Sequence, residues 1–495
     1  PTCVPWDVFG PAPSAAAVNY LNVFGVIQGI TSEQIANFNV TGLLGEMGWK
    51  TPWAEDGIAV NAGVEYRRES LDLNPDQSFQ TGDLSGQGAP TLPVSGNFKV
   101  WEVFGEVQIP IVQNSFIDEL TFSAGYRKSW YTTSNDRKYD TDTYKLALEF
   151  APIRDLRFRG SYNRAVRAPN IQELFGPQFV GLDGTKDPCA GLTDAAGNPR
   201  GVLATDYGCI AQGLAIGQSP SANPAGQYNG LLGGNPTMLP ETGTTTTLGV
   251  VLQPRFIPRL ALTVDWWDIK LKNAIQGFGA DAILNACVNQ STATFTSPAC
   301  DLIQRDPAGS LWLTPGGFVR DLPSNTSVMR NRGIDLNASY SHPLFSLGKM
   351  SWSFVGTRML KARVDNGLSE PYDCVGYYGG TCSGGTVAAS APIPKWRHKL
   401  RASWQSRFGL GLSLQWRYVG KVKAETLQDN ETVGSPNNFD PGLSVKAQSY
   451  FDLAGTFNLM DRVSLRAGIN NLFDNDPPRI TGGNANVDGT NLCPN

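Results

Sequence analysis

The chain has 495 residues, a net charge of −4 and eight cysteines. A nucleic-acid-binding protein usually carries a basic surface, so this acidic balance argues against that class. Hydrophobic residues are 41% of the chain, yet no stretch reaches the ~18 unbroken apolar residues that a membrane-spanning helix needs. Helical periodicity is also almost absent, which argues against a soluble α/β enzyme.

Taken in chain order, the sequence predicts about fourteen strands, and many of them are longer than the ~5–6 residues usual in soluble sheets. They are residues 35–47, 58–73, 96–112, 119–134, 141–151, 155–168, 241–253, 259–275, 325–341, 349–364, 395–406, 410–424, 448–460 and 462–473. Residues 410–418, for example, alternate between an apolar and a polar side chain. Such strands fit a sheet with lipid on one face and a wet lumen on the other.

The connections between these strands mostly alternate between short and long. The long ones are Asn74–Ser95, Pro169–Pro240, Gln276–Ser324, Asp365–Pro394 and Glu425–Ala447. Asn135–Asp140 is the exception, because it is short where a long loop is expected. This rhythm predicts an all-β fold, a transmembrane antiparallel β-barrel with long extracellular loops and short periplasmic turns. A soluble β-sandwich gives no reason for it.

Aromatic residues near the predicted strand ends favour an interfacial girdle over ordinary sheet packing. They are Trp49, Trp53, Trp130, Tyr131, Trp266, Trp267, Trp396 and Tyr418. The strand at 259–275 departs from the pattern, because Asp268 and Lys270 follow Trp266 on its apolar face. Either a β-bulge shifts the phase there, or the strand has already left the membrane.

Two motifs resemble those of a known family. NRAVRAPNIQELF, from Asn163 to Phe175, resembles an R-A-P-x-x-x-E-L-F element within the barrel of TonB-dependent receptors, and AGINNLFDNDPP resembles the segment before that family's last strand. The matching residues are Arg167, Ala168, Pro169, Glu173, Leu174 and Phe175 in the first motif, and Asn471, Leu472, Phe473 and Asp474 in the second.

The resemblance implies a 22-stranded barrel with a plugged lumen. Residues 1–495 are then expected to be a partial barrel domain, without the N-terminal plug, the first strands and the last strand. The implied function is energy-coupled uptake of a scarce small molecule (siderophore-iron, a vitamin, a carbohydrate or similar) across the outer membrane of a Gram-negative bacterium. The implied partners are outer-membrane lipid and lipopolysaccharide, and the TonB complex through the missing N-terminal part. No covalent chemistry and no cofactor are expected.

Two other functions stay open at this stage. One is a passive porin-like channel, and the other is a surface scaffold that partners a lipoprotein or a surface-layer protein. Porins lack the R-A-P-x-x-x-E-L-F element, which favours the receptor. No catalytic residue pattern is present, so an enzyme is not expected.

Six cysteines fall in pairs within the long loops, which predicts the disulfides Cys189–Cys209, Cys287–Cys300 and Cys374–Cys382. The rival is a metal site, but no C-x-x-C occurs and both histidines, His342 and His398, lie outside these loops. Cys3 and Cys493 could pair with each other or with cysteines in missing sequence. Three aspartates in one loop (Asp183, Asp187 and Asp194) do not match a calcium-loop spacing. No metal site is therefore expected.

Loop aromatics and lumen-facing arginines are the candidate ligand contacts, since rings can bind sugars or aryl groups and arginines attract anions. The aromatics are Tyr228, Trp312, Phe318, Tyr377 and Tyr378, and the arginines are Arg157, Arg159 and Arg417. For any single residue of this set, loop packing of the aromatics or solvation of the arginines in the lumen is favoured over ligand contact. Arg164, Arg167 and Glu173 are expected to be a charge-paired strand end rather than a ligand-responsive hinge, because Pro169 ends the strand there.

Overall fold

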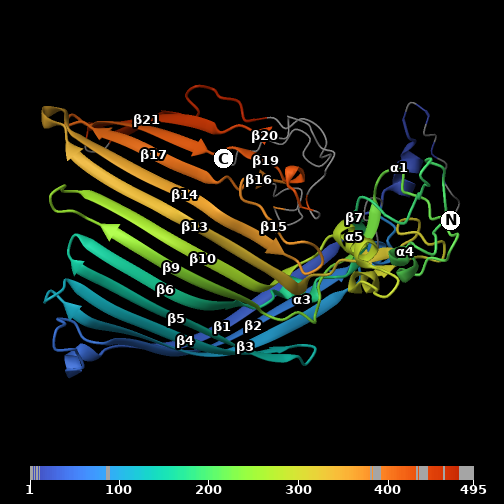
Figure 1. The fold of residues 1–495 in the computed structure, drawn as a ribbon, viewed down its shortest axis with the longest axis horizontal. Helices are drawn as coiled ribbons and strands as arrows, with labels where there is room; N and C mark the ends of the chain where they lie inside the picture. The colour runs from blue at the N-terminus through green and yellow to red at the C-terminus, as the bar shows by residue number, and fades with distance from the viewer. Residues whose placement is uncertain are drawn as a thin grey trace.

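Fourteen long strands form one continuous antiparallel sheet in the computed structural model (Figure 1). Their order is β1-β2-β3-β4-β5-β6-β9-β10-β13-β14-β17-β18-β21-β22, with the short β15 paired to β14 beside this path. The structure describes residues 4, 6, 9–10, 12–84, 90–379, 382, 392–430, 433, 444–460 and 463–478. Cys3 and Cys493 lie outside the described residues.

The bounds of this barrel sheet follow the predicted strands in order. They are β1 (Ile27–Leu43), β2 (Ala59–Pro75), β3 (Val94–Gln113), β4 (Glu119–Thr133), β5 (Lys138–Ile153), β6 (Leu156–Arg167), β9 (Glu241–Leu252), β10 (Leu260–Gln276), β13 (Ser324–Pro343), β14 (Lys349–Asp365), β17 (Trp396–Gln405), β18 (Leu410–Val419), β21 (Gln448–Met460) and β22 (Val463–Ile469). The all-β prediction is confirmed. The largest difference is in β1, which starts well before residue 35 because Ile27 still pairs with Pro75.

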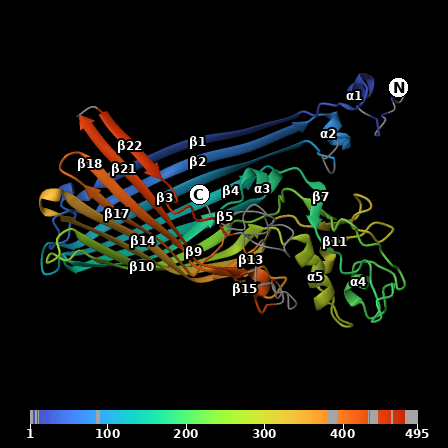
Figure 2. The ribbon, with the colours of Figure 1, turned by 90° about the horizontal axis from the view of Figure 1, so that it is seen from above.

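The long connections gather at one end of the sheet and the short ones at the other, and we call these the long-loop end and the short-turn end (Figures 1 and 2). Asn135–Asp140 becomes a tight turn between β4 and β5, with Asp136 at a φ of 58°. None of the helices in the described part of the chain is long and apolar enough to cross a bilayer.

The chain outside the barrel sheet contains short elements that were not predicted from the sequence, since most of them have two to seven residues, too few to establish a period. One small sheet has the order β11 (Ile303–Gln304), β12 (Phe318–Arg320), β8 (Tyr228–Leu232), β7 (Phe179–Gly184), and another has the order β16 (Tyr377–Tyr378), β19 (Val422–Ala424), β20 (Ser444–Val445), while β15 is Tyr372–Asp373. The helices are α1 (Ala15–Leu21), α2 (Gln77–Thr81), α3 (Ile171–Phe175), α4 (Tyr207–Ala211) and α5 (Ala280–Gln290), with 3-10 turns η1 (Leu44–Met47), η2 (Pro298–Leu302), η3 (Phe345–Leu347) and η5 (Glu425–Leu427).

The phase change in β10 does not come from a bulge. The pairing of β10 with β13 runs without a shift from Leu260 to Leu271, and its pairing with β9 is regular through Lys272. Asp268 and Lys270 therefore share the outer face with Trp266. The charged residues lie farther along the strand toward the long-loop end, which fits the alternative that the strand has left the apolar layer.

The residues of the expected aromatic girdle do not all lie on one face of the sheet, because neighbouring residues of a strand point to opposite faces. Trp130 and Trp266 point outward, whereas their neighbours Tyr131 and Trp267 must point to the inner face. Tyr131 is accordingly buried in a cluster with Phe98. The girdle expectation is thus wrong for Tyr131 and Trp267, because adjacent strand residues cannot both face lipid.

Candidate functional site

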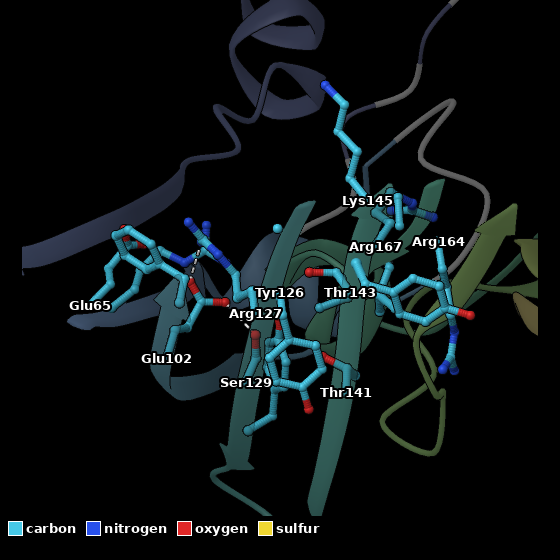
Figure 3. A pocket seen from close by; sticks show the side chains of 18 of the residues that line it. Glu65, Glu102, Tyr126, Arg127, Ser129, Thr141, Thr143, Lys145, Arg164 and Arg167 are labelled. Atoms are coloured by element: carbon cyan, nitrogen blue, oxygen red, sulfur yellow. Dashed lines mark hydrogen bonds and ion pairs between the residues drawn. The ribbon is translucent and has the colours of Figure 1, made fainter. Parts of the chain in front are cut away.

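The inner wall of β2–β6 forms a hollow of about 730 Å³ near the long-loop end (Figure 3). Nine of its 24 lining residues are charged, among them Glu65, Glu102 and Arg127. Glu102 is the most buried of these carboxylates and accepts hydrogen bonds from Arg127 Nη1 at 2.6 Å and Ser129 Oγ at 2.6 Å. Arg127 also lies over the Phe104 ring, 4.6 Å from its centroid.

The R-A-P-x-x-x-E-L-F element borders this hollow. Asn170 caps α3 in a reciprocal capping box, in which its Oδ1 accepts from the Glu173 N–H at 2.8 Å and Glu173 Oε2 accepts from the Asn170 N–H at 2.7 Å. Leu174 is 1% exposed and packs in one cluster with Phe98. Phe175 lies so close to Gly96 that a Cβ there would approach its ring within 2.2 Å.

Arg167 connects the motif to the barrel. Its guanidinium donates to both oxygens of Glu241, at 2.7 and 2.9 Å, and to both oxygens of Glu173, at 2.9 and 3.1 Å. Glu241 Oε1 also accepts from the Ile275 N–H at 2.6 Å. One arginine thus joins the end of β6, α3, the start of β9 and the end of β10, which supports a charge-paired strand end.

The three arginines proposed as ligand contacts face the lumen, and each is already ion-paired. Arg157 contacts Glu119 and Glu149, at 2.6 and 2.9 Å. Arg159 contacts Asp265 at 2.7 Å, and Arg417 contacts Asp452 at 2.8 Å. These partners neutralise most of the attraction that the arginines could offer an anion.

Other lumen cations are not neutralised. Arg397, Lys399 and Arg401 occupy alternate positions of β17, are exposed, and form no ion pair among the described residues. Arg401 donates instead to the neutral Oε1 of Gln415, at 2.8 and 3.2 Å. This basic strip was not predicted from the sequence. The alternation of these cations with Trp396, His398 and Leu400 was the signal that could have revealed it.

The loop aromatics divide between buried and partly exposed positions. Tyr228 and Tyr378 are 3% and 0% exposed, and the Tyr228 hydroxyl accepts from the Asn223 N–H at 2.9 Å. Their burial assigns them to loop packing. Trp312, Phe318 and Tyr377 are only partly buried, and Trp312 Nε1 donates to the Ser221 carbonyl at 3.0 Å.

The connections β6–β9 and β10–β13 pack into one compact unit, residues 176–234 and 277–321, which we call the loop module. Its core clusters contain α5, Tyr228 and the sulfur atoms of two disulfides, Cys189–Cys209 and Cys287–Cys300. The third expected disulfide, Cys374–Cys382, is also present in the structure, outside this unit.

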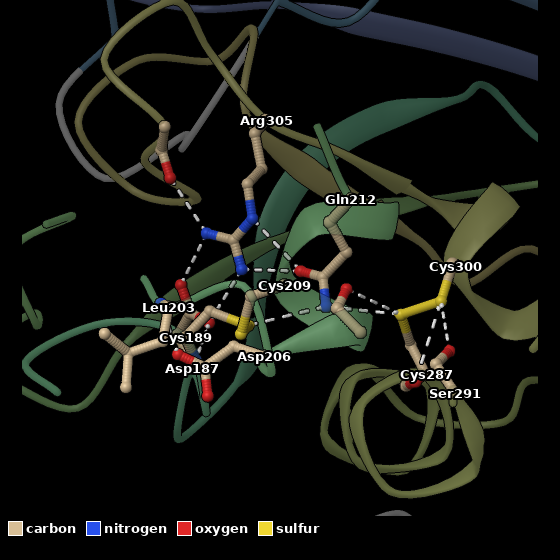
Figure 4. The surroundings of a disulfide bond; sticks show 12 residues. Asp187, Cys189, Leu203, Asp206, Cys209, Gln212, Cys287, Ser291, Cys300 and Arg305 are labelled. Atoms are coloured by element: carbon tan, nitrogen blue, oxygen red, sulfur yellow. Dashed lines mark hydrogen bonds and ion pairs between the residues drawn. A yellow bond between two sulfur atoms is a disulfide. The ribbon is translucent and has the colours of Figure 1, made fainter. Parts of the chain in front are cut away.

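A buried ion pair joins the two halves of the loop module (Figure 4). Arg305 donates two hydrogen bonds of 2.8 Å to the Asp187 carboxylate, and their side chains are 4% and 1% exposed. Gln212 Oε1 accepts from Arg305 at 2.6 and 3.0 Å, and Gln212 Nε2 lies 3.3 Å from Cys287 Sγ. The network fixes the two disulfide-bonded segments relative to each other.

A second junction lies at the start of α5. Asp183 Oδ2 accepts from the Ala280 N–H at 3.2 Å, and Asp321 accepts from Phe278 and Gly279 at 2.6 and 3.0 Å. Burial, and next the Asp321 carboxylate, raises the pKa of Asp183 to about 7, while burial raises the pKa of Asp321. Both carboxyl groups therefore keep a proton to a higher pH than an exposed aspartate does. Within the described residues no group of three or more His, Cys, Asp or Glu side chains is placed to hold a metal ion.

Comparison with known proteins places this geometry in a family. The profile described as "TonB dependent receptor-like, beta-barrel" matches residues 10–472. The chain is similar to a mutant ferric enterobactin receptor of Pseudomonas aeruginosa in complex with enterobactin, with 17% identity and a TM-score of 0.55 over 94% of this chain and 52% of that one. It is also similar to a siderophore receptor of Acinetobacter baumannii, with 12% identity and a TM-score of 0.53 over 94% and 53%. The chain thus spans about half the length of these structures. A comparison with curated proteins found no match.

Proposed function

Because the chain belongs to the TonB-dependent receptor-like β-barrel family, we propose that it forms the barrel wall of an outer-membrane receptor for energy-coupled uptake of a small nutrient. The observation that carries this proposal is the contrast between the two faces of the barrel sheet. On β18, Leu412, Leu414 and Trp416 share one face, while Ser413, Gln415 and Arg417 share the other. This contrast suits lipid outside and an aqueous path inside.

The loop module supports the same function, since it supplies a preorganised surface at the mouth of the barrel. Two disulfides and the buried Arg305–Asp187 pair restrict its motion. A rigid binding surface loses less conformational entropy when a ligand docks. The long-loop end is therefore the extracellular side in this proposal, and the short-turn end is periplasmic.

Ligand contacts are proposed at two levels. Trp312, Phe318 and Tyr377 would meet a ligand at the loops, and the β17 cations Arg397, Lys399 and Arg401 would meet it along the wall. The two similar structures are siderophore receptors, so ferric siderophores are the first ligands to test. Vitamins and carbohydrates follow as the other nutrient classes.

A growth screen tests the proposal. A strain that lacks the full-length protein is grown with single iron chelates, vitamins or carbohydrates at limiting concentration, and binding of the labelled nutrient to whole cells is measured. We expect loss of growth and of surface binding for one nutrient class, both restored by the full-length gene. Normal growth on every nutrient, with altered surface assembly, would favour the scaffold function instead.

Two sets of variants distinguish the proposed ligand contacts on β17 from an arginine that is already neutralised by a carboxylate. Replacing Arg397 and Lys399 with Gln is expected to weaken binding of an anionic nutrient by about tenfold or more, because each removes an unpaired lumen cation. Replacing Arg159 with Gln, together with Asp265 with Asn, removes a cation and its partner carboxylate, and is expected to leave affinity within about twofold. Equal losses in both variants would contradict the proposed contacts on β17.

A further inference from the structure

The helix α3 follows β6 in the chain but packs on the inner face of β2 and β3. The barrel sheet has the order β2-β3-β4-β5-β6, so α3 must cross β4 and β5 to reach them. Leu174 lies in one apolar cluster with Leu71 of β2 and Phe98 of β3, and the Phe175 ring lies against Gly96 of β3. The first turn of the β6–β9 connection therefore crosses part of the long-loop end (Figure 2).

A second segment of the same connection lies against α3 and continues the crossing toward β13. The Asn235 N–H donates to the Glu173 carbonyl at 2.7 Å. Asn235 Nδ2 donates to the Pro323 carbonyl, just before β13, at 2.8 Å. We call the two segments, residues 168–176 and 234–239, the crossbar. It links the inner face of β2 and β3 to the start of β13.

The crossbar also covers the turn between β4 and β5. Asn135 Nδ2, in that turn, donates to the Pro236 carbonyl at 3.2 Å. A long β4–β5 loop would have to occupy the space that the crossbar fills. This contact accounts for the short connection Asn135–Asp140 at a position where the alternation of loop lengths predicts a long one.

An apolar seal separates the crossbar from the charged hollow on the inner wall. Phe98 and Tyr131 line the hollow and also belong to the cluster that holds Leu174, and they are 2% and 6% exposed. Glu102 lies four residues beyond Phe98 on β3, which is about 13 Å farther from the long-loop end at ~3.3 Å per residue. Close-packed side chains leave no passage for a hydrated molecule, so the hollow is closed toward the long-loop end and opens to the lumen.

The contacts that hold the crossbar identify it as a fixed element. Arg167 ties its start to Glu241 of β9 through two hydrogen bonds. At the other end of α3, a Cβ on Gly96 would approach the Phe175 ring within 2.2 Å, so only glycine allows this docking. A movable lid has few buried apolar contacts, whereas the crossbar is anchored by buried apolar residues and by ion pairs.

We propose that the crossbar is a permanent seal on the β2–β6 side of the barrel mouth, and that a nutrient enters the lumen past β14, β17 and β18. The exposed cations Arg397, Lys399 and Arg401 lie on that second wall. The entry route rests on the proposed uptake function. The seal itself does not, because it follows from the packing of the crossbar alone.

The test measures which wall an external reagent reaches. Two variants of the full-length protein carry a sensor cysteine, Thr143→Cys in the hollow and Thr357→Cys on β14, directly opposite Arg397. Intact cells are treated with a membrane-impermeant maleimide, and the labelled peptides around residues 143 and 357 are quantified over time by mass spectrometry. Counting these peptides alone excludes the native cysteines.

Two glycine substitutions test whether the crossbar causes the protection. Gly96→Val is combined with Thr143→Cys, because the new side chain must displace the Phe175 ring. Gly243→Ala is the matched control, since a Cβ there meets no heavy atom closer than 3.8 Å. We expect residue 357 to react at least about tenfold faster than residue 143, because a sealed site reacts only when it opens. Gly96→Val should remove most of this difference, and Gly243→Ala should preserve it.

Three results would overturn the proposal. Equal labelling of the two sensors would show that no seal exists, and protection that persists in Gly96→Val would show that the crossbar is not its cause. Absence of labelling at residue 357 would exclude the entry route. If Gly96→Val does not reach the membrane, Phe175→Ala, which removes the same contact, must raise labelling at residue 143. The experiment needs no nutrient, so failure of the seal is distinguishable from failure of the uptake function.

Discussion

Arg167 donates two hydrogen bonds to Glu241, a residue 74 positions later in the chain, at 2.7 and 2.9 Å. Because the same guanidinium also holds Glu173, the first turn of the long β6–β9 connection is fixed to the barrel. The motif that identified the family is therefore an anchor for a loop.

Replacing Arg167 with Ala is expected to destabilise this anchor by about 1–3 kcal/mol, because Glu241 loses its charged partner while it stays largely buried. Limited proteolysis should then cut the β6–β9 connection faster. Arg164→Ala is the control, since Arg164 lies three residues away and forms no ion pair within the described residues. Equal cleavage of both variants would contradict the anchoring role.

Removing the buried cation of the loop module should destabilise the protein more than Arg167→Ala does. Arg305→Ala leaves the Asp187 carboxylate buried without its partner, for which about 3–5 kcal/mol is typical. Hydrogen exchange of α5 and β7 should accelerate while the barrel strands stay protected. In contrast, Arg255→Ala breaks an exposed pair with Asp155 and should cost at most about 1 kcal/mol. If hydrogen exchange of α5 and β7 is unchanged in Arg305→Ala, the ion pair does not hold the two halves of the loop module together.

The disulfides are expected to act locally. Replacing Cys189 and Cys209 with Ser opens a link between residues 20 positions apart and should destabilise the loop module by about 3 kcal/mol. Replacing Cys374 and Cys382 with Ser should leave the module unchanged, because that bond lies in another connection. Hydrogen exchange of α5 distinguishes the two variants, and an equal response would show that the loops are coupled throughout.

The loop module should lose stability as pH rises toward neutrality. Asp183 has a pKa raised to about 7 by burial and by Asp321, against about 3.9 in an unfolded chain. Between these values the folded module binds more protons than the unfolded one, so its stability is greatest below about pH 4 and falls until about pH 7. Exchange rates of α5 measured from pH 4.5 to 8, corrected for intrinsic chemistry, should show this loss.

Asp183→Asn should flatten that profile, because the amide stays uncharged at every pH. Asp194→Asn is the control, since Asp194 lies in the same loop and hydrogen bonds from Asn198 lower its pKa. A pH profile that is the same in the wild type and in Asp183→Asn would exclude Asp183 as its source.

The sequence was sufficient for the barrel strands because a two-residue period repeated over ten or more residues leaves a clear pattern. The cysteine pairs were also predictable, since both members of each pair lie in one loop. The sequence could not show which arginines are neutralised. Arg417 and Arg397 both alternate with apolar residues, but only Arg417 has an ion-pair partner on the next strand, Asp452, which lies diagonally across from it and directly opposite Gln415.

The loop module could not be predicted from the sequence for a related reason. Arg305 and Asp187 are 118 residues apart, and nothing in either local segment specifies the other. Short strands such as β11 gain their stability from the sheet that they join, so their own residues carry little signal. Adjacent aromatics posed the remaining problem, because only the pairing register decided that Trp266 faces outward and Trp267 inward.

Energy-coupled uptake is tested most directly by the initial rate of uptake before and after the proton-motive force is collapsed. Cells carrying the full-length protein are given the labelled nutrient found in the growth screen, with and without a protonophore, and surface binding is measured in parallel. If the protein is an energy-coupled receptor, the protonophore abolishes uptake and leaves binding intact. Uptake that continues at the same rate without the proton-motive force would identify a passive channel instead.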